Sequence, residues 1–183
     1  MLKKRTWQPL TDTHKDELIL LLVYAHQLAQ RTPSMRRLAT QLIKVTAWRW
    51  TADAINSMTG EVVNDAIKID IRYLAHTVEA ATVSAQYPKE MRRRLTHEHT
   101  IPLKLLAEKV FTIPAGDKGA IREIFDGYCW AALITNEEDR MLSSAGLRSA
   151  MPPGWKFGDD LLARYNAVGI KILPPLGGQL VHG

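Results

Sequence analysis

Residues 95–102 read Leu-Thr-His-Glu-His-Thr-Ile-Pro, and the character of the chain changes at this stretch. The stretch is polar and rich in histidine, and its β-branched residues stand close to Pro102. Because a residue before proline is driven away from helical geometry, we expect an extended segment over residues 96–101. A second extended segment is expected over residues 129–134, where apolar residues follow one another without helical spacing. We predict that the two segments lie near each other.

Upstream of this stretch, apolar residues recur with the 3.6-residue period of a helix. Thr11 or Thr13 can cap the first helix, whose apolar stripe consists of Leu18, Leu21, Leu22, Ala25, Leu28 and Ala29. A second helix begins at Pro33, and the Trp-Arg-Trp segment at residues 48–50 either ends it or begins a turn.

Three further helices are expected before residue 95. The first covers residues 52–58. The second, over residues 61–85, would turn four apolar side chains inward, namely Ile67, Ile71, Leu74 and Val78. The third is short, begins at Pro88 and carries Arg92, Arg93 and Arg94.

Downstream, helices are predicted over residues 103–110, 117–125 and 159–168, and a last strand over residues 170–173. Thr135 or Asn136 caps another helix, whose acidic first turn suits the positive end of the helix dipole.

The expected fold is mainly α with a small two-stranded element. We expect a basic helical module over residues 1–94, then a second unit over residues 95–183 with a C-terminal helix and a loose tail.

The composition indicates a folded protein without a membrane span. The chain has 183 residues, of which 46% are hydrophobic and 23% are charged, and this excludes disordered and collagen-like classes. The longest apolar run, residues 18–25, is far shorter than the roughly 20 residues that cross a bilayer. No signal-peptide cleavage site follows it, so we expect a cytoplasmic protein.

The single cysteine, Cys129, forbids an internal disulfide and a multi-cysteine zinc cluster. It lies in an apolar run, so we interpret it as a small buried hydrophobe rather than a catalytic thiol.

The formal net charge is +5, and all of this excess lies within residues 1–100. Such a charge is compatible with a polyanionic partner.

His97, Glu98 and His99 form the one dense group of metal-capable side chains. In an extended segment the two histidines would point to one face and Glu98 to the other. The alternative interpretation is a solvated polar loop with two surface histidines. The spacing does not match the helical His-Glu-x-x-His zinc motif, which needs histidines four residues apart.

Residues 98–102, Glu-His-Thr-Ile-Pro, resemble the first motif of the HNH (His-Me finger) endonucleases. That motif is an acidic residue or histidine, the catalytic histidine, two residues and a proline. The family's active-site unit consists of two short strands and a helix around one divalent metal ion. The expected strand over residues 129–134 and the helix after it look like the rest of that unit. The resemblance covers about residues 95–145 and implies a ββα-metal-like core there.

The resemblance implies His99 as the general base that activates water, and Glu98 as the first metal ligand. Glu138 or Asp139 would stand where the family most often has a second, histidine ligand. The implied cofactor is a divalent metal, Mg²⁺ or Mn²⁺. The sequence departs from the family pattern in three ways: the downstream helix has no histidine, no cysteine pairs accompany the motif, and the insert between the two strands is long and helical.

Several other residues are candidates for binding. Arg92, Arg93, Arg94 and His97 adjoin the motif and are predicted to contact DNA phosphates, or else they decorate a solvated helix face. Trp48 and Trp50 either stack on bases or, as we favour, pack in the core and at an interface. The remaining helical histidines, His14, His26 and His76, are interpreted as structural.

Two functional interpretations follow. The first is a metal-dependent DNA endonuclease whose N-terminal helices hold DNA, a protein partner or a second copy of the chain. The second is a catalytically inactive binding module derived from the same core, acting on nucleic acid or protein in phage defence or regulation. A purely structural α-helical protein is a third, weaker interpretation.

Overall fold

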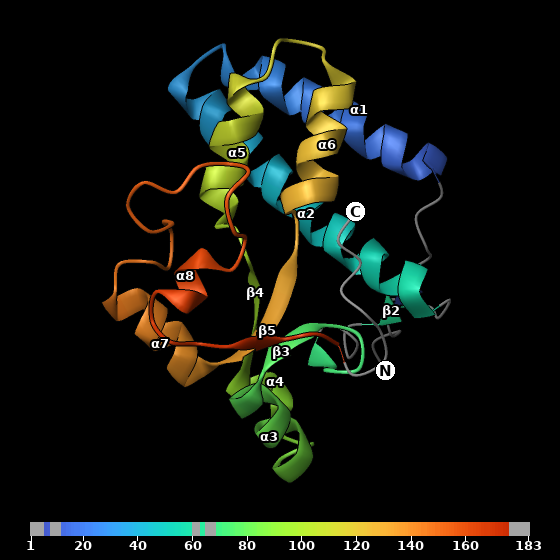
Figure 1. Ribbon diagram of the computed structural model, residues 1–183. Helices are drawn as coiled ribbons and strands as arrows, with labels where there is room; N and C mark the ends of the chain where they lie inside the picture. The colour runs from blue at the N-terminus through green and yellow to red at the C-terminus, as the bar shows by residue number, and fades with distance from the viewer. Residues whose placement is uncertain (1–5, 8–11, 60–62, 65–68, 176–183) are drawn as a thin grey trace.

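The computed structural model describes residues 6–7, 12–59, 63–64 and 69–175. Figure 1 shows a helix bundle at one end of the molecule and a small sheet with shorter helices at the other. The bundle consists of α1 (Asp12–Ala29), α2 (Pro33–Thr59), α5 (Leu103–Thr112) and α6 (Lys118–Tyr128). No described helix is long and apolar enough to cross a bilayer.

The bundle buries most of the apolar stripe that the sequence predicts for its first helix and part of the second helix. Leu22, Ala25, Ile43 and Ala47 are fully buried, and they pack with residues of α5 and α6 in one continuous core. Helix α2 runs through the Trp-Arg-Trp segment without a break, because its buried spacing continues to Trp50. The Trp50 ring meets the Phe125 ring edge-on, with centroids 5.4 Å apart.

The main sheet has four strands in the order β4 (Leu95–His99), β5 (Ala131–Thr135), β3 (Ala75–Thr77) and β6 (Ile172–Leu173). β4 and β5 are antiparallel, with His97 opposite Leu133, so the prediction of two neighbouring extended segments is confirmed. β3 runs parallel to β5 and antiparallel to β6. A separate two-stranded pair joins β1 (Thr6–Trp7) to β2 (Val63–Asn64). The mainly helical class is confirmed, whereas the expected two-stranded element is a four-stranded mixed sheet.

The long helix expected over residues 61–85 is wrong. Its described part holds β3 followed by a shorter helix, α3 (Val78–Gln86), while Ile67 lies outside the described residues. Thr77 causes the change, because its hydroxyl accepts a hydrogen bond from Ala80 N at 3.0 Å and thereby starts α3. Leu74 is buried as expected, but Val78 is half exposed.

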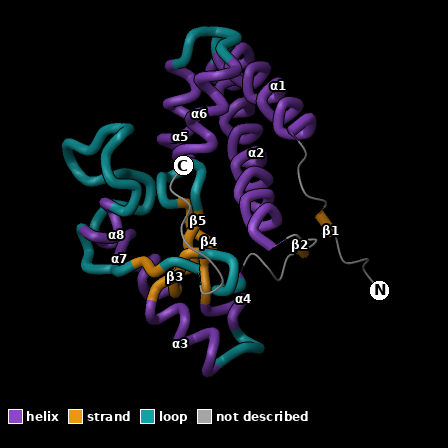
Figure 2. Tube along the Cα trace, turned by 45° about the vertical axis from the view of Figure 1, so that its right-hand side comes forward, coloured by secondary structure: helices purple, strands orange, loops and turns teal. Residues whose placement is uncertain are grey.

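The two faces of the sheet carry different helices, as Figure 2 shows. Side chains of Leu95 and Leu133 pack under α3 and α4 (Met91–Arg94), and α2 passes over the His99 end of the same face. The opposite face packs Ile134 against α7 (Asn136–Ser144) and α8 (Ala163–Asn166). We call these the α2 face and the α7 face.

The C-terminal part is less helical than the sequence suggests. Only Ala163–Asn166 of the helix expected over residues 159–168 forms, and Gly169 ends it with a φ of +75°, a conformation that L side chains rarely adopt. The expected last strand is present as β6. The sequence predicts a loose tail at the C-terminal end, and residues 176–183 lie outside the described part.

The sequence predicts a boundary between two units at residue 94, and both the helix bundle and the main sheet contain residues from either side of that position. α1 and α2 share their core with α5 and α6, and β3 lies between β5 and β6. Each layer therefore draws on residues from both sides of that position.

Candidate functional site

The β4 strand sends its chemistry-bearing side chains to opposite faces of the sheet, as expected for alternating residues. His97 and His99 lie on the α2 face, where both rings contact Trp48. Glu98 lies on the α7 face, where it meets Arg164 of α8. The nuclease resemblance implies that Glu98 and His99 act at one site, but their side chains lie on opposite faces of the sheet.

His99 is enclosed between the sheet and α2. Its side chain is 6% exposed, and its Nε2 lies 3.3 Å from the Thr51 hydroxyl. Burial lowers the pKa of His99 from its usual 6.5 to about 4. The imidazole is consequently neutral at pH 7. Very little of its surface is accessible to solvent.

His97 stacks on the Trp48 ring, with centroids 4.6 Å apart and planes 22° from parallel. Trp48 is 37% exposed, and Trp50, two residues later, is buried in the bundle core. The Trp-Arg-Trp segment thus contributes one core residue and one partly exposed residue at the boundary between α2 and the sheet.

Glu98 is occupied by an arginine of the same chain. Its Oε1 accepts a hydrogen bond from Arg164 Nη2 at 2.5 Å, and Arg164 is fully buried. Burial raises the pKa of Glu98, an effect that Arg164 opposes and the nearby charge of Asp139 reinforces. The carboxylate thus already has a cation beside it.

Arg164 is also bound to the backbone on the α7 face. Its guanidinium donates to the carbonyl oxygens of Thr100 at 3.0 Å, Leu147 at 3.0 Å and His99 at 2.5 Å. Nη2 also lies 3.2 Å from the Tyr165 hydroxyl. These bonds join the end of β4 to α8 and to the loop after α7.

The two acidic candidates on α7 have different surroundings. Glu138 is 5% exposed, and its Oε2 accepts hydrogen bonds from Thr135 N at 2.7 Å and Thr77 Oγ1 at 2.8 Å. With Thr135 it forms a capping box that starts α7. Asp139 is partly exposed and lies close enough to Glu98 for its charge to act on that carboxyl.

This donor set does not fit a divalent cation as it is arranged. Glu98 is paired with Arg164, Glu138 is held by its cap and by Thr77, and only Asp139 is free of such a role. Within the described ranges no group of three His, Cys, Asp or Glu side chains has the geometry of a metal site.

The three arginines lie on α4, immediately before β4. Arg93 and Arg94 both pair with Glu90 at 2.7 Å, and the Arg94 guanidinium lies 4.2 Å from the centre of the Tyr87 ring. Arg92 is exposed. Asn136 Nδ2 donates to the Arg93 carbonyl at 2.7 Å and thereby ties α4 to the start of α7.

Cys129 is buried as the sequence indicates, and burial raises the pKa of its thiol to about 12. Its Sγ lies 3.5 Å from the Ala47 carbonyl. His26 and His76 are also buried.

Sequence reasoning missed Arg164 and Thr77, the two side chains that hold the acidic candidates. The signal for Arg164 was a charged residue inside the mostly apolar run at residues 161–165. Thr77 gave no signal, because it lay within the stretch expected to be helical.

Comparison with known proteins found no matching family model, no matching curated protein and no matching solved structure.

Proposed function

We propose that the protein is a non-catalytic binding module for duplex DNA, built around the β4–β5–α7 unit. The observation that carries this proposal is the ion pair between Glu98 and the buried Arg164. A guanidinium beside this carboxylate supplies the positive charge that a metal ion would otherwise bring. Displacing it would leave a buried arginine without its partners, which is costly in free energy.

The burial of His99 supports the same choice over catalysis. A general base must come within hydrogen-bond reach of the water it activates. The His99 ring instead contacts Thr51 and Trp48, on the face opposite Glu98.

The α4 arginines support DNA as the ligand. They adjoin β4 and α7, and the Arg93 side chain is 75% exposed. Exposed ion pairs such as those with Glu90 contribute little free energy, so phosphate groups can compete for these guanidinium groups.

The test is a salt titration of DNA affinity, with fluorescence anisotropy of a labelled 20-base-pair duplex as the readout. We expect binding that weakens with salt and depends little on sequence. In the triple variant Arg92→Ala, Arg93→Ala and Arg94→Ala, the slope of log affinity against log salt should fall by roughly 0.9 for each phosphate group that the variant no longer neutralises.

A matched control removes three positive charges at the far end of the bundle through Arg31→Ala, Arg37→Ala and Lys118→Ala. These residues lie at the α1–α2 turn and at the starts of α2 and α6, remote from α4 in Figure 1. The control should keep most of the wild-type slope. Equal slopes for the wild type and the α4 variant would overturn the proposal.

Metal-dependent DNA cleavage is the second candidate, favoured by the neutral state of His99, which is the state that a general base needs. Supercoiled plasmid is incubated with wild type or His99→Ala, in Mg²⁺, Mn²⁺ or EDTA. The binding-module proposal expects no nicking in any of these conditions. Metal-dependent nicking that His99→Ala abolishes would replace it with the nuclease.

A further inference from the structure

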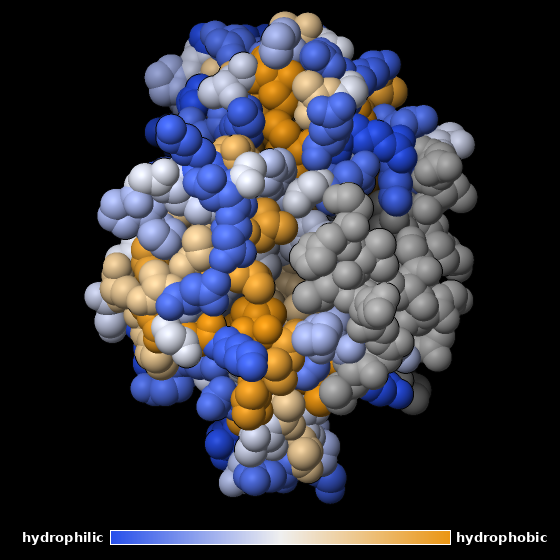
Figure 3. Space-filling model, viewed as in Figure 1, coloured by the Kyte–Doolittle hydropathy of each residue, from blue (hydrophilic) through white to orange (hydrophobic). Residues whose placement is uncertain are grey.

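A groove of about 620 Å³ lies between α5 and α6, away from the β4 site. Figure 3 shows an apolar surface between the polar flanks of these two helices. The apolar lining consists of Ile113, Ala120, Ile124, Tyr128, Phe157 and Leu161. Its volume lies within the range of small-molecule sites in proteins.

One end of the groove is formed by an aromatic group. The Phe157 ring meets Tyr128 and Trp155 edge-on, with centroid distances of 5.0 Å and 5.1 Å. The loop that carries Phe157 is held by a hydrogen bond from Lys156 N to Asp159 Oδ2 at 2.7 Å and another from Trp155 Nε1 to the Asp160 carbonyl at 2.9 Å. The aromatic wall is therefore fixed in place by its own loop.

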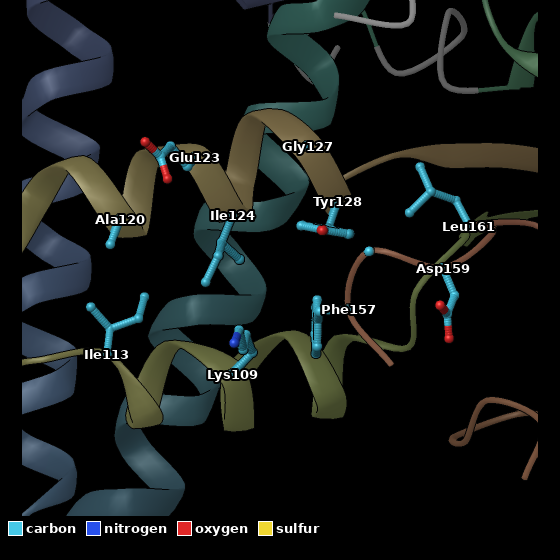
Figure 4. A pocket seen from close by; sticks show the side chains of 11 residues that line it. Lys109, Ile113, Ala120, Glu123, Ile124, Gly127, Tyr128, Phe157, Asp159 and Leu161 are labelled. Atoms are coloured by element: carbon cyan, nitrogen blue, oxygen red, sulfur yellow. The ribbon is translucent and has the colours of Figure 1, made fainter. Parts of the chain in front are cut away.

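One cation faces this apolar space. Figure 4 shows Lys109 pointing from α5 into the space between the helices, whereas Glu123 points away from it. The Lys109 ammonium lies 5.4 Å from the centre of the Phe157 ring. In the described part of the chain it has no carboxylate partner, and Glu108 beside it pairs with Arg36.

We propose that this groove binds a small amphipathic carboxylate. The carboxylate would pair with Lys109, and the apolar chain would lie along Ile113 and Ile124. The wall from Ala120 to Tyr128 covers eight helical steps, about 12 Å, which suits an unbranched acid of roughly eight to ten carbons. This site is independent of the DNA-binding proposal.

Charge decides between this ligand and others of the same shape. A neutral chain would gain the apolar contacts alone, and a cationic chain would meet the like charge of Lys109. The ring face of Phe157 attracts the lysine ammonium and keeps it directed over the groove. Asp159 also lines the groove, but its carboxylate accepts a hydrogen bond from Lys156 N in its own loop and is not paired with Lys109. At the Lys109 position an anionic head group therefore suits the groove better than a neutral or a cationic one.

The test measures binding of octanoate, 1-octanol and octylammonium to the full chain by isothermal titration calorimetry. We expect saturable binding of octanoate that is stronger than that of the other two. Lys109→Met should weaken octanoate binding about tenfold, because it removes a charge-assisted hydrogen bond and keeps the length of the side chain. Lys109→Arg should retain it within about threefold, since that variant keeps the charge.

Lys104→Met is the matched control, because Lys104 is exposed on the same helix and does not line the groove. It should bind octanoate as the wild type does. Amide shifts from nuclear magnetic resonance should localise octanoate to α5, α6 and residues 157–161. Absence of saturable octanoate binding, shifts confined elsewhere, or equal binding of octanoate and octanol to the wild type would overturn the proposal. If Lys109→Met fails to fold, the ligand comparison on the wild type and the Lys109→Arg variant decides the outcome.

Discussion

Arg164 and Glu98 form an ion pair across the α7 face, in which a fully buried guanidinium donates to a largely buried carboxylate at 2.5 Å. The same guanidinium binds the backbone at the end of β4. Arg164 therefore holds the end of the strand in position and also balances the charge of Glu98. This arrangement makes Arg164 a structural centre of the candidate site.

Replacing Arg164 should destabilise the fold strongly. Arg164→Ala removes the partner of Glu98 and leaves the backbone carbonyl oxygens that bind the guanidinium without their donor, so we expect a loss of about 3–5 kcal/mol in the free energy of unfolding. Urea titration followed by circular dichroism measures it. Arg140→Ala is the control, because Arg140 pairs with Glu137 at the surface, and it should cost less than about 1 kcal/mol. A similar loss in both variants would contradict the role of Arg164.

Glu138 should act as a helix cap rather than as a free acid. Glu138→Ala removes the acceptor for Thr135 N and for the Thr77 hydroxyl, so we expect a loss of about 1–3 kcal/mol. Glu137→Ala, at the exposed neighbouring position, should change stability by no more than about 0.5 kcal/mol. Thermal unfolding of both variants compares them, and a Glu138→Ala protein as stable as wild type would exclude the cap.

Cys129 offers a measure of local opening in the bundle. Because its thiol is buried and its pKa is raised to about 12, the native protein should react with a thiol reagent only through unfolding. The reaction of the single thiol should therefore be slow in buffer and complete in denaturant. Fast, stoichiometric labelling of the native protein at neutral pH would contradict the burial.

The sequence predicts the elements whose signals are local. The apolar spacing of the first helix places Leu22 and Ala25 in the core, and Thr135 caps α7 with Glu138 three residues later. The sequence also predicts β4 and β5 as extended segments, because the helical spacing of apolar residues stops there. Each of these signals lies within a few residues of the element it specifies.

The central strand β3 has no such signal. It is three residues long, and its placement depends on pairing with Leu133 of β5 and Leu173 of β6, which are distant in sequence. The relation between Glu98 and Arg164 is also long-range, since 66 residues separate them. Sequence spacing identified Glu98 as a charged residue of interest, but only the fold shows that its partner is an arginine.

His99 should make the stability of the protein depend on pH between about 4 and 6.5. Its pKa is lowered to about 4 in the folded state, whereas an unfolded histidine titrates near 6.5. The unfolded chain thus binds the proton more readily in this window, so lowering the pH favours unfolding. The contribution of His99 is complete above pH 6.5 and is lost progressively down to pH 4, to a total of about 3 kcal/mol.

Urea unfolding at pH 7.0, 6.0, 5.0 and 4.5 measures the slope of the free energy of unfolding against pH. His99→Gln should flatten it, while His14→Gln, at an exposed position, should leave it unchanged. An equally steep loss of stability in the wild type and in His99→Gln would show that another group is responsible.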